Sequence, residues 1–216
     1  MISQNTKKLI YSLATFLLLG LGISLQVKAG IGQSMFNAFS LILADLFHLE
    51  LGTMLNIINL MLLFINLLIK RSLVKRQDLL QLAATILSGY IVNFYLYTVL
   101  DQLIVQAYIM KLMLFTVGLV LASFSLGAIL AMEIIQFPLE SLCIQLGQKL
   151  SHKMSTIRMR FDIFFAISTV ILAFTTNHGL QLREGTIISF FLLSRLIGFS
   201  YYFIKNKIGS SNFVKK

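Results

Sequence analysis

The charged residues that interrupt the apolar runs of this chain are the most informative about its chemistry. Arg195 lies midway along an apolar run at 186–204, and Glu140 lies in a short segment at 134–147. A charged side chain at the centre of a bilayer costs about 2.5–3.5 kcal/mol even on insertion scales that give low penalties. Because a charge so placed needs a partner of opposite sign, we expect Arg195 and Glu140 to form a buried ion pair.

Two roles fit such a pair. It either only holds two helices together, or it also contacts a substrate or an ion. Gly198 and Tyr202 follow Arg195 at three and seven residues, so a gap and a hydroxyl group share the helix face of the guanidinium. Glu140 has apolar neighbours in the sequence, and a carboxyl group in such a place can hold a proton and couple solute movement to protons.

Two short segments differ from the other apolar runs. The segment at 30–47 begins with Gly30 and Gly32 and carries several polar side chains, and the segment at 134–147 has about 14 residues and contains the single proline, Pro138. Runs of 10–14 residues are more often re-entrant or interfacial than spanning. The residues predicted to bind a substrate come from these segments and from the helices beside them: Gln33, Asn37, Asn59, Gln136, Glu140, Asp162, Arg195 and Tyr202.

Asn59 and Asp162 have a second interpretation. Polar side chains in membrane helices often form hydrogen bonds between helices, worth about 0.6 kcal/mol each on average. Asp162 also fits an interfacial position, because Arg158 and Arg160 precede it directly. Both interpretations of these two residues stay open at the level of sequence.

The composition places these residues in a membrane protein. The chain has 216 residues, of which 57% are hydrophobic and 12% charged, whereas soluble domains have about 45–50% apolar and about 25% charged residues. This composition excludes an ordinary soluble enzyme, and the length leaves no room for a catalytic domain outside the membrane. We therefore expect an all-α polytopic membrane protein that forms a single domain over residues 1–216.

Counting basic residues on each side of the membrane tests the number of crossings. If the two short segments do not cross, 14 Lys and Arg residues lie on the side of the N-terminus and three on the other. If all eight apolar runs cross, the counts are 11 and six. Because basic residues collect on the cytoplasmic side of short loops, the sequence favours six crossings and cytoplasmic N- and C-termini.

The chain also contains a weak internal repeat, with halves at about 9–100 and 112–204. At an offset of 103 residues, Asn37 aligns with Glu140 and Asn59 aligns with Asp162. Three crossings in each half would invert the second half relative to the first. Inverted repeats are common in transporters, where interrupted segments in matching positions of the two halves indicate a binding site near the midplane.

Three motifs of the first half resemble a known family. Gly20-Leu-Gly22, the stretch Lys28-Ala-Gly-Ile-Gly-Gln-Ser-Met-Phe-Asn37 and the stretch Leu49-Glu-Leu-Gly-Thr53 are similar to the YczE/YyaS/YitT family of bacterial integral membrane proteins. The family's usual proline and aspartate are replaced here by Met35 and Asn37. The resemblance covers about residues 10–205. It implies a bacterial cytoplasmic membrane protein, in a family mostly without assigned biochemistry and loosely linked to export or secondary-metabolite production.

Other kinds of site are not predicted. The single cysteine, Cys143, excludes an internal disulfide, and the three histidines are too far apart in sequence to suggest a metal site. We expect no cofactor and no enzymatic activity, since no nucleotide-binding or hydrolase motif is present. The net charge of +10 comes from short basic clusters between apolar runs, which indicates contacts with membrane lipids and not with nucleic acid.

Two functions follow from these expectations. The first is a transporter or exporter of a small-molecule substrate, with a midplane site between the two repeats. The second is a non-transporting scaffold or regulatory partner of a biosynthetic or secretion complex, which acts as a homo-oligomer or with a membrane protein partner. A water-accessible cavity that reaches Glu140 or Arg195 would favour the transporter, and a dry, packed midplane would favour the scaffold.

Overall fold

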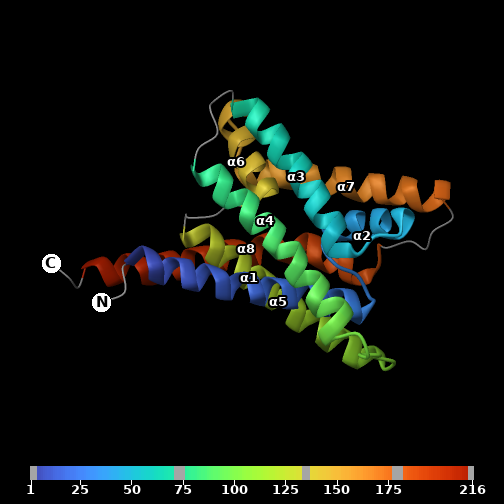
Figure 1. Cartoon of the computed structure of the whole chain (residues 1–216). Helices are drawn as coiled ribbons and strands as arrows, with labels where there is room; N and C mark the ends of the chain where they lie inside the picture. The colour runs from blue at the N-terminus through green and yellow to red at the C-terminus, as the bar shows by residue number, and fades with distance from the viewer. Residues whose placement is uncertain (1–3, 71–75, 133–136, 177–181, 214–216) are drawn as a thin grey trace.

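The computed structural model describes residues 4–70, 76–132, 137–176 and 182–213, and all regular structure in these ranges is helical (Figure 1). The helices are α1 (Gln4–Ala29), α2 (Met35–Phe47), α3 (Leu51–Lys70), α4 (Arg76–Phe94), the π-helical turn η1 (Tyr95–Val99), α5 (Tyr108–Met132), α6 (Pro138–Leu150), α7 (Met154–Thr176) and α8 (Glu184–Phe213).

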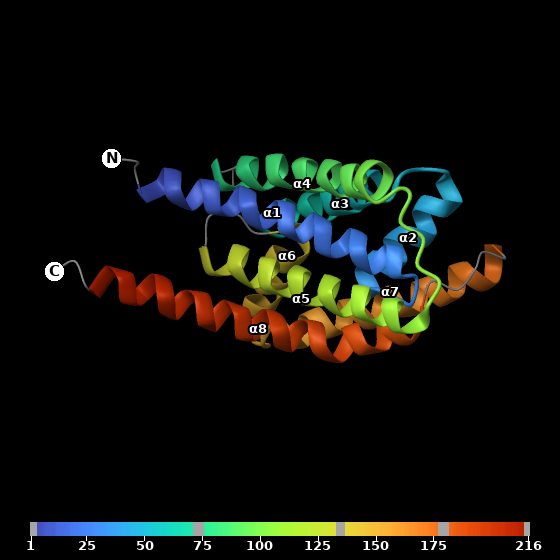
Figure 2. The same cartoon turned by 90° about the horizontal axis from the view of Figure 1, so that it is seen from below.

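Five of the helices are long and apolar enough to cross a membrane. The candidate spans are Tyr11–Ala29, Leu51–Lys70, Asp78–Val99, Tyr108–Met132 and Glu184–Lys207. The protein is therefore an all-α polytopic membrane protein, as its composition predicts. The predicted sixth crossing is α7, which is not one of these five spans; its 23 residues have a length of about 34 Å, enough to cross. The two ends of the chain lie at the same end of the bundle (Figures 1 and 2).

The helices α2 and α6 are too short to cross. Each has 13 residues and a length of about 20 Å, against a hydrocarbon core of about 30 Å. Before α2 the backbone has positive φ at Gly30 and Gly32, and a Cβ atom on Gly32 would clash with the backbone nitrogen of Thr186. The Oγ atom of Ser34 then accepts a hydrogen bond from the Asn37 backbone N–H and caps α2.

The bounds of several helices match at one fixed spacing. Residues 103 apart begin α2 and α6 (Met35 and Pro138), end them (Phe47 and Leu150), and begin α3 and α7 (Leu51 and Met154). His48 and Ser151, also 103 apart, are the non-glycine residues with positive φ in the described ranges, and each terminates one of the two short helices. This spacing equals the offset at which the two halves of the sequence align.

Three of the helix pairings follow the same correspondence. α1 packs against α5, α2 against α7 and α3 against α6. Exchanging each helix for its counterpart in the other half leaves these three pairings unchanged. The first pairing is close because Gly22 and Gly118 face each other: a Cβ atom on Gly22 would lie 2.8 Å from the Gly118 carbonyl oxygen.

Candidate functional site

A cluster of three buried charged residues links the first turn of α6 to α7. The Nη1 atom of Arg158 donates a hydrogen bond to Oε1 of Glu140, and its Nε atom donates to Oδ1 of Asp162 at 3.3 Å. Glu140, Arg158 and Asp162 are 5%, 8% and 7% exposed. Arg158 and Asp162 are four residues apart on one face of α7, and α7 packs against α6, so one guanidinium reaches both carboxylates.

The predicted ion pair between Arg195 and Glu140 is wrong. Glu140 pairs with Arg158 instead, and Arg195 is exposed on α8. The reason lies in the packing, because α8 packs mainly against α5, whereas α6 packs against α3 and α7. The guanidinium nearest to Glu140 therefore comes from α7.

The cluster contains two acidic groups and one basic group. With both carboxyl groups ionised, two negative charges face one positive charge, and we refer to Glu140, Arg158 and Asp162 as the charge triad. Removing charged groups from water is unfavourable unless their charges are balanced and hydrogen-bonded. The triad as it stands therefore favours binding of one further positive charge, from a proton or from a cationic ligand.

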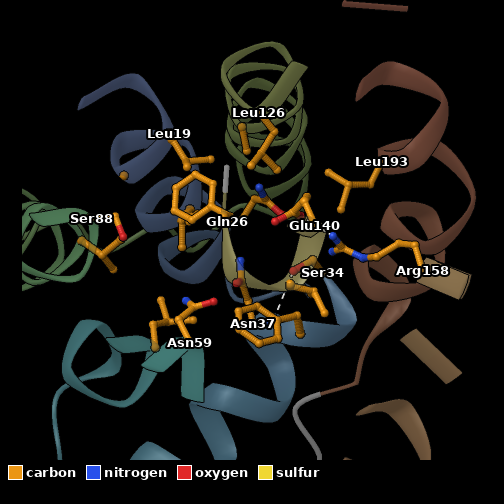
Figure 3. A pocket seen from close by; sticks show the side chains of 18 residues that line it. Leu19, Gln26, Ser34, Asn37, Asn59, Ser88, Leu126, Glu140, Arg158 and Leu193 are labelled. Carbon is orange, nitrogen blue, oxygen red and sulfur yellow. Dashed lines mark hydrogen bonds and ion pairs between the residues drawn. The ribbon is translucent and has the colours of Figure 1, made fainter. Parts of the chain in front are cut away.

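The Glu140 and Arg158 members of the triad line a cavity of about 80 Å³ at the centre of the bundle, which we call the central cavity (Figure 3). All eight α-helices contribute residues to its wall. The side chains of Glu140 and Arg158 point toward one another at its edge (Figure 3). The other polar residues of the wall are Gln26, Ser34, Asn37, Asn59 and Ser88.

The wall of the central cavity is built largely from counterparts in the two halves. Twelve of its 18 residues form six pairs 103 residues apart. The pairs are Leu19 with Ala122, Ile23 with Leu126, Ser34 with Phe137, Phe36 with Leu139, Asn37 with Glu140, and Leu55 with Arg158. The cavity thus lies where equivalent positions of the two halves meet.

A second cavity, of about 790 Å³, is also lined by Glu140 and Arg158. We call it the side pocket. It is lined by residues of α5, α6, α7 and α8, and it shares only Glu140 and Arg158 with the central cavity. The remaining residues of its wall are Leu130, Ile144, Met154, Ser155, Ser194, Ile197, Gly198, Tyr201 and Tyr202. The ion pair therefore belongs to the walls of both cavities.

One side chain of the central cavity has a hydrogen-bond acceptor without a partner. Gln26 on α1 is 2% exposed, and its Nε2 atom donates to the Gly22 carbonyl oxygen at 3.4 Å. No group in the described part of the chain donates to its Oε1 atom. Such a buried acceptor costs free energy unless a donor reaches it, so it marks a place where a ligand that donates a hydrogen bond is favoured.

Comparisons with known proteins place the chain in a family. A model of a family of unknown function, DUF6198, matches residues 6–202. The chain belongs to this family. It is also 28% identical over 137 residues to the uncharacterized protein YyaS of Bacillus subtilis (strain 168), a match that covers 63% of this chain and 67% of YyaS. The resemblance to the YczE/YyaS/YitT family is thus confirmed. No solved structure is detectably similar.

This DUF6198 chain brings some of the predicted site residues together and leaves others apart. Asn37, Asn59 and Glu140 line the central cavity, and Tyr202 lines the side pocket. Asp162 is buried, accepts a hydrogen bond from Arg158 and lines neither cavity.

Three predicted residues do not join the site. Gln33 is buried outside both cavity walls, and its backbone N–H donates to Oγ1 of Thr186. Arg195 lies outside both walls as well. Gln136 lies outside the described residues.

The residue that the sequence analysis missed is Arg158. It was counted among the basic residues of a cytoplasmic loop, although α7 already begins at Met154. The signal that indicates its role is its spacing of four residues from Asp162 at the start of an apolar helix. Gln26 was missed too, and its signal is a long polar side chain near the end of an apolar run. Within the described ranges, no group of three or more His, Cys, Asp and Glu side chains is placed to hold a metal ion.

Proposed function

We propose that this protein is a small transporter or exporter of a small solute in the bacterial cytoplasmic membrane, with both termini cytoplasmic. The binding site is the central cavity, between two inverted repeats. The observation that carries the proposal is the Glu140–Arg158 pair, a buried ion pair that forms the common wall of two cavities. The protein is not an enzyme in this proposal.

The position of the ion pair supports transport over a purely structural role. An ion pair that only joins two helices requires no cavity beside its charges. Here Glu140 lines two cavities, and access of water to Glu140 through either of them would favour a transporter. The pair belongs to the walls of both cavities, so a movement of either side chain would alter both.

The paired construction of the central cavity also supports the proposal. In transporters with inverted repeats, the substrate lies at the interface of the repeats near the bilayer midplane, beside interrupted or short helices. The short helices α2 and α6 contribute Asn37 and Glu140, at corresponding positions, to the wall of the cavity. Alternating access requires a site whose wall is formed by both halves, because movement of one half against the other then opens the site to one side of the membrane or the other.

The proposal is tested with purified protein in liposomes that contain a pH-sensitive dye. The panel covers amines, amino acids, carboxylates, sugars and nucleosides, each added outside with and without a pH gradient. We expect at least one class to cause a proton or solute flux that Glu140→Gln abolishes. Glu184→Gln is the matched control, because Glu184 is exposed at the start of α8 and lines neither cavity. If no class moves and the wild type equals Glu140→Gln, the protein is not a transporter.

One observation favours a second function, as a scaffold or regulatory partner in a membrane complex. Arg195 is exposed near the middle of the span Glu184–Lys207, beside exposed apolar side chains such as Phe191 and Phe199. An arginine at this depth is unfavourable against lipid tails, and an acidic residue of another membrane chain would stabilise it. Chemical crosslinking in membranes distinguishes the two functions, since a scaffold requires a neighbour at Arg195 and a transporter does not.

A further inference from the structure

We propose that the central cavity binds the ammonium group of a small amine, which replaces Arg158 as the partner of Glu140. The inference rests on the proposed function, because it names the class of solute that the same site takes. It follows from the charge of the triad, from the hydrogen-bond groups of the cavity wall and from the size and polarity of the two cavities.

The charge of the triad favours a cation. Arg158 offers one positive charge to two carboxylates, so a ligand with a single positive charge brings the buried cluster to neutrality. A carboxylate or phosphate ligand would instead lower the net charge of the occupied site to −2 or below. Each of the three side chains of the triad is at most 8% exposed. Buried charge without compensation is strongly unfavourable, so the charge balance excludes an anionic substrate.

The hydrogen-bond groups of the wall favour an ammonium group over a cation without N–H donors. An ammonium group has up to three donors and no acceptor. The Oε1 atom of Gln26 is buried and without a donor in the described part of the chain, and Gln26 and Glu140 belong to the same wall. Asn37 and Asn59 also line that wall, and each amide has a carbonyl oxygen that can accept a hydrogen bond. The wall therefore offers enough hydrogen-bond acceptors for the N–H groups of one bound ammonium group.

The size of the cavities sets the shape of the ligand. The central cavity has about 80 Å³, less than the roughly 150 Å³ of a protein cavity that holds benzene. It accepts a primary ammonium group with one or two carbons. A longer alkyl chain would lie in the side pocket, where Leu130, Ile144, Met154 and Ile197 form an apolar surface next to Glu140 and Arg158. A short linear alkylamine fits this arrangement best.

The same geometry allows exchange of the amine for a proton. When an ammonium group pairs with Glu140, Arg158 keeps its hydrogen bond to Asp162 and need not leave the protein interior. When the amine leaves, a proton can neutralise the excess charge in its place. Among the described residues, the ionisable groups near Glu140 are Arg158, Asp162, the thiol of Cys143, and the hydroxyl groups of Tyr201 and Tyr202 in the wall of the side pocket. Because one positive charge neutralises the triad, the amine and the proton compete for it.

The test is equilibrium binding of radiolabelled methylammonium and butylammonium to the full-length protein in lipid nanodiscs. Butyrate serves as the anionic control and butanol as the uncharged control. We expect saturable binding of both amines, tighter for butylammonium. Glu140→Gln is expected to weaken binding at least about tenfold, as loss of a charged hydrogen-bond partner does. Glu184→Gln is expected to bind as the wild type does.

Gln26 provides a second, milder variant. Gln26→Met keeps the volume of the side chain but removes the free acceptor, and we expect it to weaken amine binding severalfold while the helical content and the elution volume of the protein stay unchanged. Equal binding by the wild type and Glu140→Gln overturns the inference, as does binding of butyrate in place of the amines. If another class of solute moves in liposomes while amines do not bind, this inference fails and the proposed transport function stands. If nothing moves and nothing binds, both fail.

Discussion

Replacing Arg158 by methionine is the most direct test of the physical account of the site. Methionine approximates the apolar stem of the arginine side chain and removes its charge and its donors. Glu140 and Asp162 then lie buried without their guanidinium, since Arg158 donates to both of them in the wild type. The variant thus measures how much the positive charge of Arg158 contributes to the free energy of unfolding.

The expected cost follows from the burial of the triad. Removing one partner of a buried ion pair costs about 3–5 kcal/mol, because a charge is left without compensation. Here two carboxylates lose their partner at once, so we expect the free energy of unfolding to fall by at least about 3 kcal/mol. The loss becomes smaller as the pH falls, because protons then neutralise the two carboxylates in place of Arg158.

Asp162→Asn gives the opposite expectation at the same site. It removes the excess negative charge and can keep a hydrogen bond to Nε of Arg158, which lies 3.3 Å from the carboxylate oxygen in the wild type. Hydrogen bonds between groups inside membrane proteins average about 0.6 kcal/mol. We therefore expect a change below about 1 kcal/mol, in either direction.

The measurement is unfolding in mixed micelles with increasing fractions of a denaturing detergent, followed by circular dichroism. Arg160→Met is the matched control, because Arg160 lies two residues from Arg158 on α7 and is exposed. Surface substitutions of this kind change stability by about 0.5 kcal/mol or less. If Arg158→Met unfolds as Arg160→Met does, or if Asp162→Asn is the more damaging variant, the assignment of an uncompensated buried charge is refuted.

Two further predictions concern the packing that holds the site. Gly22→Val should destabilise the contact of α1 with α5 by about 1–3 kcal/mol, since an added Cβ would lie 2.7 Å from the Ala122 backbone nitrogen; Gly198→Ala, with no atom within 4 Å of its added Cβ, is the control in the same unfolding assay. Asn66 on α3 donates to Oγ of Ser141 on α6 at 2.8 Å, and a double-mutant cycle of Asn66→Ala and Ser141→Ala should give a coupling energy of about 0.6 kcal/mol. A coupling energy near zero would show that this bond does not hold α3 against α6.

Much of the fold is predictable from the sequence because it depends on the lipid environment and on the lengths of the apolar segments. The lipid environment forces long apolar helices, and runs of 13 residues are too short to cross, so both features follow from composition and spacing. The register of the two halves is visible for the same reason: polar residues are rare in this chain, and the few that align, such as Asn37 with Glu140, stand out against an apolar background.

The ion pair was predicted incorrectly because pairing depends on which helices pack together. The sequence shows that Glu140 needs a cation, but Arg158 and Arg195 are both compatible with that need until α7 is placed against α6 and α8 against α5. The hydropathy of the surrounding residues favoured Arg195, since it lies in the middle of an apolar run. Arg158 lies next to the loop after α6, yet its side chain is buried because α7 begins four residues before it.

The two halves share geometry but differ in charge, and the difference has a physical reason. The counterparts of Glu140, Arg158 and Asp162 in the first half are Asn37, Leu55 and Asn59, which are all neutral. A second triad at these positions would place twice the excess negative charge around a cavity of about 80 Å³. Restricting the charges to α6 and α7 keeps the excess at one, which a single proton or ammonium group neutralises. The first half then contributes amide groups, which accept and donate hydrogen bonds without altering that balance.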